Sequence, residues 1–306
     1  MIKFNRLLTI LYILVNKQSL AYSRNEQKRA TMKSSDCVFD LETVSVAFSA
    51  SDGLHMVLKD IDFKVRQGDW IAIVGKNGSG KSTLTKVLTG LCPISRGTMH
   101  TRDQTLVQLV FQDPDAQIVG ETVYEEICFG MENQCFDPVD MPKQVQNVLQ
   151  QIGLNVQIDR PVSTLSGGQK QLLNIASCLA VHASVLIFDE ATAMLSPMAR
   201  GKILDVVHNL HQQGVTVIWV TQWMNELSYA QKVIVLEQGN IAFRGSCQDF
   251  FYPESSESGS SPCEQLGFSP PYAIQVARNL LRNGYSLVNL PTCTEELMQA
   301  VKASWQ

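Results

Sequence analysis

The sequence predicts an α/β protein with a mostly parallel central sheet. Three continuous apolar runs, at residues 70–74, 185–188 and 215–220, are typical of strands that are buried on both faces. A helical pattern precedes each of the last two runs, and this alternation of helix and strand indicates a parallel sheet. The chain has 306 residues, 45% apolar and 18% charged, so it can bury one large core beside a small appendage.

Residues 1–36 are predicted to form an extension ahead of the folded domain. Lys3 and Arg6 precede an apolar run at 7–15 that resembles a signal peptide or a short anchor. The run is too short to cross a bilayer, because a spanning helix needs roughly 20 apolar residues. Basic sequence and then Met32 follow it, so we expect translation to begin near Met32. The intact mass of the natively expressed protein tests this expectation.

Short alternating runs over residues 37–65 predict antiparallel strands that come before the central sheet. A strand-like run at 107–111 comes later, and the pattern over residues 121–180 is mostly helical. Within that segment one apolar face repeats at helical spacing, which predicts an inserted helical subdomain. The residues of this face are Val145, Val148, Leu149 and Ile152. We assign residues 37–250 to the main domain.

The last part of the chain, residues 251–306, is predicted to be a linker and a small helical domain. Residues 253–262 are rich in serine, glutamate and proline, and such a segment cannot bury enough apolar surface to fold. Apolar residues at helical spacing then predict a helix, and Thr292 with Glu295 predicts a capping box for a last one. The apolar residues are Ile274, Ala277 and Leu281.

A glycine-rich loop follows the first buried strand and matches the pattern G-x-x-x-x-G-K-S. It lies ahead of a helical pattern at 83–88, and this strand-loop-helix context is the one that phosphate binding requires. Glycines let the backbone turn tightly, so amide N–H groups and a helix N-terminus converge on phosphates. Lys81 adds a cation for the β- and γ-phosphates, and Ser82 offers a hydroxyl to Mg²⁺. The residues predicted to bind nucleotide are Gly75, Lys76, Asn77, Gly78, Ser79, Gly80, Lys81, Ser82 and Thr83.

Two adjacent carboxylates, Asp189 and Glu190, follow the apolar strand at 185–188. We expect Asp189 to hold Mg²⁺ through its hydration shell and Glu190 to polarise an attacking water as general base. The alternative is a solvated turn, which is less favoured because a phosphate-binding loop lies in the same chain. Together the two features predict nucleotide hydrolysis.

Charge and cysteine content give no reason to expect other classes of site. The net charge is −4, whereas nucleic-acid binding usually needs a basic face, so we expect no nucleic-acid partner. The eight cysteines are scattered without a C-x-x-C pair. Reduced thiols are therefore favoured over a disulfide or zinc framework.

The segment at 165–171 reads L-S-G-G-Q-K-Q and resembles the signature motif of the ATP-binding-cassette (ABC) family. The resemblance covers residues 37–245 and implies an ATPase with a P-loop NTPase fold that uses ATP and Mg²⁺. In that family the signature residues of one subunit contact the γ-phosphate bound by the other subunit. Small residues at a helix N-terminus suit this role, because they admit a phosphate and the helix dipole attracts its charge. The residues carried over are Ser166, Gly167, Gly168 and Gln169.

Further family positions are matched one at a time. Gln112 resembles the glutamine that reaches Mg²⁺ and the attacking water and couples to the transmembrane partner. Phe48 occupies the place of the aromatic residue that stacks on adenine, and a core phenylalanine on an edge strand is the alternative.

Two positions depart from the family pattern. Gln222 stands in place of the switch histidine, and Ser196 stands where an aspartate is usual in a loop at the dimer interface. Glutamine can also donate to a phosphate and orient water. Gln222 is therefore either a tolerated substitution or the mark of a slow but active site.

A narrower resemblance is to the energy-coupling factor (ECF) and cobalt or nickel importer ATPases. It rests on residues 111–117, on Thr122 and Val123, on 129–133 and on the tail around 266–268. It implies two ATPase subunits, as a homodimer or a heterodimer, beneath a transmembrane coupling protein. A separate membrane protein captures a vitamin or metal ion, so the cargo is not readable from this chain. The subunit itself is then peripheral, on the cytoplasmic face of the membrane.

Two other functions are less favoured. A soluble ABC protein acting on ribosomes or DNA usually has two cassettes or long coiled-coil insertions, and neither a second phosphate loop nor heptads occur in this sequence. A regulatory nucleotide binder without turnover would not need Glu190. The sequence thus predicts the ATPase of an importer.

Overall fold

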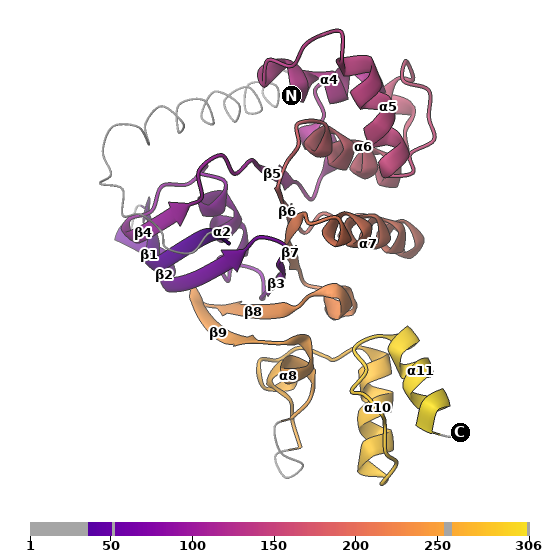
Figure 1. The fold of residues 1–306 in the computed structure, drawn as a ribbon. Coiled ribbons are helices and arrows are strands. Elements are labelled where there is room, and N and C mark those ends of the chain that lie inside the picture. Colours follow the sequence, from indigo (N-terminus) through magenta and orange to yellow (C-terminus); the bar gives the residue numbers. More distant parts are fainter. Residues whose placement is uncertain (1–35, 51–52, 254–258, 305–306) are drawn as a thin grey trace.

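The computed structural model describes residues 36–50, 53–253 and 259–304 and shows two sheets with surrounding helices (Figure 1). The apolar run at 7–15 and Met32 lie outside the described residues, so the expectations made for them stay as predictions. The strands are β1 (Cys37–Ala50), β2 (Gly53–Arg66), β3 (Trp70–Val74), β4 (Arg96–Thr101), β5 (Val107–Val110), β6 (Val185–Asp189), β7 (Thr216–Thr221), β8 (Lys232–Glu237) and β9 (Asn240–Gly245).

The smaller sheet has the strand order β2-β1-β4 and is antiparallel, which confirms the prediction from the alternating pattern. Along β2, the apolar side chains of Ile61, Phe63 and Val65 are buried, whereas Asp62 and Lys64 between them are exposed. This period of two turns one face of the sheet toward the core that it shares with β3.

The larger sheet has the order β5-β6-β7-β3-β8-β9, and every neighbouring pair is parallel except β8 with β9. Every residue of β3 and β7 is buried, which confirms the prediction of central strands covered on both faces. Since the carboxyl ends of parallel strands meet at one edge, the loops after β3, β6 and β7 lie together. The glycine-rich loop follows β3, the carboxylates Asp189 and Glu190 lie at the end of β6, and Gln222, at the position of the switch histidine, follows β7.

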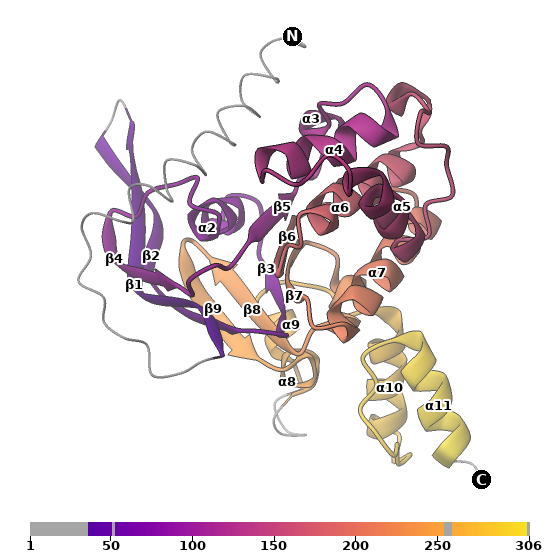
Figure 2. The same cartoon turned by 45° about the horizontal axis from the view of Figure 1, so that its top comes forward.

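Some helices cover the faces of the sheets, and three others pack together as a group of their own. Helices α4, α5 and α6 pack against one another beside the central sheet (Figure 1 and Figure 2), and their predicted apolar face is buried. No helix among the described residues is long and apolar enough to cross a membrane. The helices are α2 (Lys81–Leu88), α3 (Pro114–Gln117), α4 (Val123–Asn133), α5 (Met141–Gln151), α6 (Gly167–Ala180), α7 (Pro197–Gln212), α8 (Cys247–Phe251), α9 (Pro262–Gln265), α10 (Tyr272–Arg282) and α11 (Thr294–Ser304), with the 3-10 helices η1 (Val162–Thr164) and η2 (Met224–Tyr229).

The tail after β9 is helical. Helix α8 packs against α9 and β9, and α10 pairs with α11 at the end of the molecule far from α4 (Figure 1). Ile274 and Ala277 are buried and Leu281 is partly buried, as the predicted apolar face requires. The predicted architecture is therefore confirmed: an α/β fold with an antiparallel sheet, a helical insertion and a small helical appendage.

The prediction that Glu295 pairs with Thr292 in a capping box at the last helix is wrong. The carboxylate of Glu296, and not that of Glu295, accepts hydrogen bonds from the N–H (2.7 Å) and the hydroxyl (2.9 Å) of Thr292. Helix α11 begins only at Thr294, so the residue four positions after Thr292 faces back toward it.

Candidate active site

The glycine-rich loop, residues 75–80, joins β3 to α2, and its backbone needs glycine at particular positions. Gly78 and Gly80 have φ angles of 79° and 104°, in the region that residues with a Cβ rarely adopt. A Cβ on Gly75 would lie 2.5 Å from the carbonyl oxygen of Leu236. No side chain of the described residues caps α2, so its first N–H groups remain available to a ligand. The loop is therefore shaped to bind an anion.

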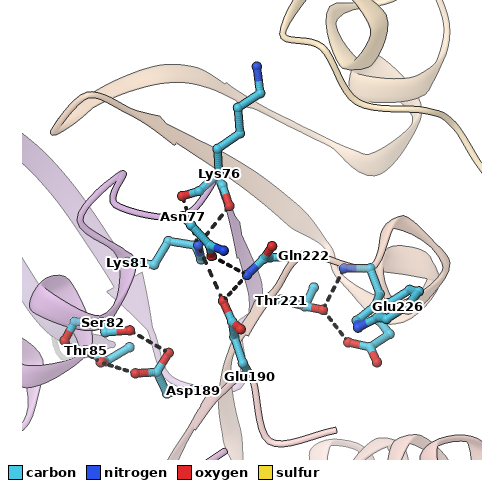
Figure 3. A network of polar contacts seen from close by, with 12 residues as sticks. Lys76, Asn77, Lys81, Ser82, Thr85, Asp189, Glu190, Thr221, Gln222 and Glu226 are labelled. Carbon is cyan, nitrogen blue, oxygen red and sulfur yellow. Dashed lines mark hydrogen bonds and ion pairs between the residues drawn. The ribbon is translucent and has the colours of Figure 1, made fainter. Parts of the chain in front are cut away.

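Lys81 is buried in the first turn of α2, and its ammonium group reaches back across the loop. Nζ donates hydrogen bonds to the carbonyl oxygens of Gly75 (2.8 Å) and Lys76 (3.2 Å). It also lies 3.5 Å from Oε1 of Glu190. The cation thus stands between the loop and the carboxylate that follows β6 (Figure 3).

Asp189 ends β6 and faces the start of α2 (Figure 3). Its two carboxylate oxygens accept hydrogen bonds from Oγ of Ser82 and Oγ1 of Thr85, each at 3.2 Å. Burial raises the pKa of Asp189, and the two hydroxyl groups oppose this rise by stabilising the charged form. Thr85 is not among the residues predicted from the sequence, although its spacing of three residues from Ser82 places both on one helix face.

Glu190 and Gln222 meet beside the loop (Figure 3). Nε2 of Gln222 donates to Oε1 of Glu190 and to Oδ1 of Asn77, at 2.7 Å each. Glu190 has a φ of 52°, which is uncommon for a residue with a Cβ and recurs at functional sites. Its N–H donates to the carbonyl oxygen of Val220 (3.0 Å), so β7 fixes this turn. The glutamine at the switch position therefore joins the loop after β3 to the carboxylate after β6.

Gln112, Phe48 and Thr83 are not part of this network. The Gln112 side chain is exposed after β5 and makes no hydrogen bond within the part of the chain that the structure describes. The Phe48 side chain is 47% exposed on the hairpin of β1 and β2, which contradicts the alternative of a core phenylalanine. Thr83 is partly buried in the first turn of α2.

The signature residues form a second group, at the N-terminus of α6. Oγ of Ser166 accepts from the N–H of Gln169 (3.3 Å), and Oε1 of Gln169 accepts from the N–H of Ser166 (3.0 Å). Gly167 and Gly168 make the first turn, and a Cβ on Gly168 would lie 3.0 Å from that of Ala199. Among the described residues, no hydrogen bond or ion pair joins this group to the glycine-rich loop.

Ser196, the other departure from the family pattern, is the N-cap of α7. Its Oγ accepts from the N–H of Ala199 (3.4 Å), and Pro197 follows as the first helical residue. Serine and aspartate are both favoured N-caps, so the serine preserves the start of this helix.

The tail contacts the glycine-rich loop at a cavity of about 290 Å³. Residues 76–79 of the loop, residues 235–238 at the end of β8, and Leu266 and Phe268 of the tail line this cavity. Nζ of Lys76 would lie 2.9 Å from a Cβ on Gly267. The Lys76 side chain points away from the Glu190–Gln222 pair (Figure 3), so it serves the contact with the tail.

The chain is similar in sequence to known ATP-binding proteins of transporters. The family model described as ABC transporter matches residues 58–193. The energy-coupling factor transporter ATP-binding protein EcfA1 of Halalkalibacterium halodurans is 38% identical over 273 residues, which are 85% of this chain and 95% of the relative. The corresponding EcfA of Methanosarcina acetivorans is 37% identical over 255 residues, which are 79% of this chain and 90% of the relative.

Two solved structures resemble the fold. The cbiO1 protein of Clostridium perfringens, described as part of the ABC transporter complex cbiONQ, matches with a TM-score of 0.66 and 28% identity, over 81% of this chain and 98% of that one. A dimeric ATP-binding cassette in a post-hydrolysis state, bound to ADP and Pi, matches with a TM-score of 0.61 and 22% identity. The match covers 68% of this chain and 98% of that one. The second likeness supports the fold alone.

Proposed function

Because this chain belongs to the energy-coupling factor transporter ATP-binding proteins, a family of ABC transporter ATPases, we propose that the site built on its own phosphate loop hydrolyses ATP to power an importer. The cargo of the importer is a vitamin or a transition-metal ion. One observation above all supports hydrolysis at this site: the Gln222 amide bridges Asn77 and Glu190 at 2.7 Å each. This bridge puts a phosphate-binding loop and a candidate base into one network.

The chain is one of two ABC ATPase subunits beneath a transmembrane coupling protein, and another membrane protein captures the cargo. The similar cbiO1 protein is described as part of a transporter complex. In such an assembly the chain is a peripheral subunit on the cytoplasmic face of the membrane. We assign residues 37–250 to the nucleotide-binding domain, with 121–180 as its helical subdomain, and residues 251–306 to the linker and appended helical domain.

ATP binding is assigned to the loop and the start of α2. The free N–H groups of α2 and the loop backbone face the phosphates, and the buried ammonium group of Lys81 adds positive charge there. Phe48, whose ring is exposed on the hairpin, is assigned to adenine stacking. Each of these groups contributes to binding rather than to proton transfer.

The oxygen groups at the start of α2 fit a Mg²⁺ ion. The hydroxyl of Ser82 and the carboxylate of Asp189 lie 3.2 Å apart, and Mg²⁺ prefers such oxygen ligands. Burial alone disfavours the charged form of Asp189 and so raises its pKa, whereas a neighbouring cation would stabilise that form. With Gln112 as a third candidate, these residues would hold the ion, which when bound neutralises charge on the phosphates.

Glu190 is assigned as the general base that accepts a proton from the attacking water. The amide of Gln222 does not ionise near neutral pH and so cannot act as an acid or a base; its task is to orient Glu190, the water and the γ-phosphate. Its hydrogen bonds to Glu190 and Asn77 hold it where it can do so. We expect this site to be active but slower than one with a histidine at position 222.

The second group of site residues acts on the nucleotide of the partner subunit. Ser166, Gly167, Gly168 and Gln169 offer a helix N-terminus without large side chains in its first turn. Such a terminus attracts a phosphate through its N–H groups and its dipole. The partner's signature motif in turn completes the site on this chain.

The test is ATP turnover of the assembled complex with and without Glu190→Gln. We expect the variant to lose most of the turnover, because the amide cannot accept the proton of the water. Glu42→Gln is the matched control, since Glu42 is exposed on β1 in the antiparallel sheet. Full turnover in Glu190→Gln would mean that the site on this chain performs no chemistry.

A further inference from the structure

Glu226 is a buried carboxylate behind the Glu190–Gln222 pair that the proposed mechanism does not use (Figure 3). It belongs to η2, and only 1% of it is exposed. A buried charge is unfavourable unless other groups pair with it or donate hydrogen bonds to it. The groups that do so here come from β7, from the loop after β6 that also holds Glu190, and from α7.

One oxygen of Glu226 is bonded to the end of β7. Its Oε2 accepts from Oγ1 of Thr221 (2.5 Å) and from Nε1 of Trp219 (3.0 Å). The same Thr221 oxygen accepts from the N–H of Trp223 (3.0 Å). The backbone on both sides of Gln222 is therefore fixed to this carboxylate.

The other oxygen is bonded to the loop after β6. Its Oε1 accepts from Oγ1 of Thr192 (2.6 Å), two residues after Glu190, and lies 3.4 Å from Nε of Arg200 in α7. The Arg200 guanidinium also lies over the ring of Trp223, 4.2 Å from its centre. The cation thus lies beside the buried charge and contacts Trp223, the residue after Gln222.

We propose that Glu226 is a positioning residue that keeps Glu190 and Gln222 at hydrogen-bond distance by tying Thr192 and Thr221 to one carboxylate. This inference rests on the proposed hydrolysis at Glu190. Glu226 does not touch the nucleotide site itself, so it acts on the geometry of the reacting groups and not on ATP binding. Small misplacements of such groups lower a rate strongly.

Glu226→Gln is the direct test, because it preserves shape but not hydrogen-bond chemistry. Each oxygen of Glu226 faces one group that can only donate, Trp219 on one side and Arg200 on the other. The glutamine NH₂ group must therefore oppose a donor in either orientation. We expect the Glu190-dependent kcat to fall roughly tenfold or more, while the KM for ATP stays within about twofold.

Substitutions of Thr192 and Thr221 distinguish an effect of the lost hydrogen bond to Glu226 from an effect of altered packing. Thr192→Val and Thr221→Val each remove a hydroxyl donor, whereas Thr192→Ser and Thr221→Ser retain it. We expect kcat to fall in the valine variants and to be retained in the serine variants. In the Glu226→Gln background the valine substitutions should have little further effect, because both act through the same carboxylate.

Tyr252→Phe is the matched control for loss of a buried hydrogen bond, since its hydroxyl donates to the carbonyl oxygen of Pro291 (2.6 Å) in the tail. It should lower the unfolding temperature without lowering kcat. Equal kcat in Glu226→Gln and wild type would overturn the proposal, as would valine effects that simply add to it. Where Glu226→Gln fails to assemble, the valine and serine variants decide, and equal kcat in both overturns the proposal.

Glu190→Gln, measured in the same complex, distinguishes a failure of the proposed hydrolysis from a failure of the proposed role of Glu226. If it retains full turnover, the hydrolysis proposed for this site fails and the role of Glu226 fails with it. If it abolishes turnover but Glu226→Gln does not lower kcat, only the role of Glu226 fails.

Discussion

The phosphate-loop group and the signature group of this chain satisfy their polar atoms in opposite ways. Around the phosphate loop, side chains from segments far apart in the sequence bond to one another, as Ser82 of α2 does to Asp189 of β6 and Gln222 to Glu190. At α6, the side chains of Ser166 and Gln169 bond only to each other's backbone within the described residues. The first group is thus assembled by one chain, whereas the second presents a helix N-terminus to whatever lies opposite.

From this difference we infer which part of the proposed ATP site one chain assembles by itself. Contacts within this chain fix the groups that we propose to bind phosphate and to accept the proton. The signature group has its own cap, and within the described residues no side chain bonds to it from another element, which fits the proposal that it acts on the second ATPase subunit. Substitutions in the two groups should therefore separate ATP binding from turnover.

The largest expected effect is on binding, at the phosphate loop. Lys81→Ala removes the buried cation, and charged hydrogen bonds of this kind are worth roughly 1.5–3 kcal/mol, or about 10- to 100-fold in affinity. Equilibrium binding of ATP to the purified complex measures the loss. Lys64→Ala is the control, because Lys64 lies on β2 and is paired with Asp40. Unchanged affinity in Lys81→Ala would refute the assignment of this loop.

The next effect is on turnover without binding, at the signature group. Gly167→Glu places a carboxylate at the exposed N-terminus of α6, where it occupies the anion position and repels a phosphate. We expect turnover of the complex to fall roughly tenfold, while ATP affinity at this chain's own loop is retained. Turnover and ATP affinity are measured on the same variant, so the retained affinity shows that the loss of turnover is not due to misfolding. A parallel loss of affinity would mean that the two groups are not independent.

A smaller effect is expected at the switch. In Gln222→His the imidazole replaces the amide between Asn77 and Glu190. We expect the Glu190-dependent turnover to rise severalfold, on the order of 1 kcal/mol in the barrier, if the glutamine slows this site. The initial rate of ATP hydrolysis measures it. Unchanged turnover would show that glutamine is an equivalent switch.

The last prediction concerns stability and leaves ATP binding and turnover aside; it is made at Glu126 in α4, next to the signature helix. Its carboxylate accepts from the N–H groups of Val119 (2.7 Å) and Gly120 (2.9 Å), and burial raises its pKa to about 7. The folded state then holds its proton more tightly than the unfolded state, so the free energy of unfolding falls as pH rises from about 4.5 to 7.

Glu126→Gln does not titrate and keeps an acceptor oxygen. Over the same pH range its free energy of unfolding should decline less than that of the wild type, by roughly 2–3 kcal/mol at most. Urea unfolding at several pH values measures this difference, with Glu42→Gln as the exposed control. Identical pH profiles for Glu126→Gln and the wild type would argue against a raised pKa.

The sequence predicted the elements that depend on local pattern. Continuous apolar runs identified β3 and β7 because strands buried on both faces leave no polar positions. The glycine-rich loop was identifiable because its backbone requires glycine, as at Gly80. The parallel sheet then places Asp189 and Glu190 beside that loop.

Contacts between distant segments were not predictable in this way. The bond from Gln222 to Asn77, the network of Glu226 and the contact of the tail with Lys76 each depend on how loops pack. The capping error at Thr292 has the same origin, because a shift of the helix start by one residue changes which carboxylate turns back. The periodicity of apolar residues locates helices and strands, but it does not predict which side chains of distant segments contact each other.

The contact between Gly267 and Lys76 has a practical consequence for shortened or fused versions of this protein. A chain cut before α9 would lose Leu266 and Phe268 from the wall of the cavity beside the phosphate loop. It would also uncover the side of α8 on which α9 packs. Affinity tags and fluorescent fusions therefore belong after α11, and any truncation should leave the chain intact through Phe268.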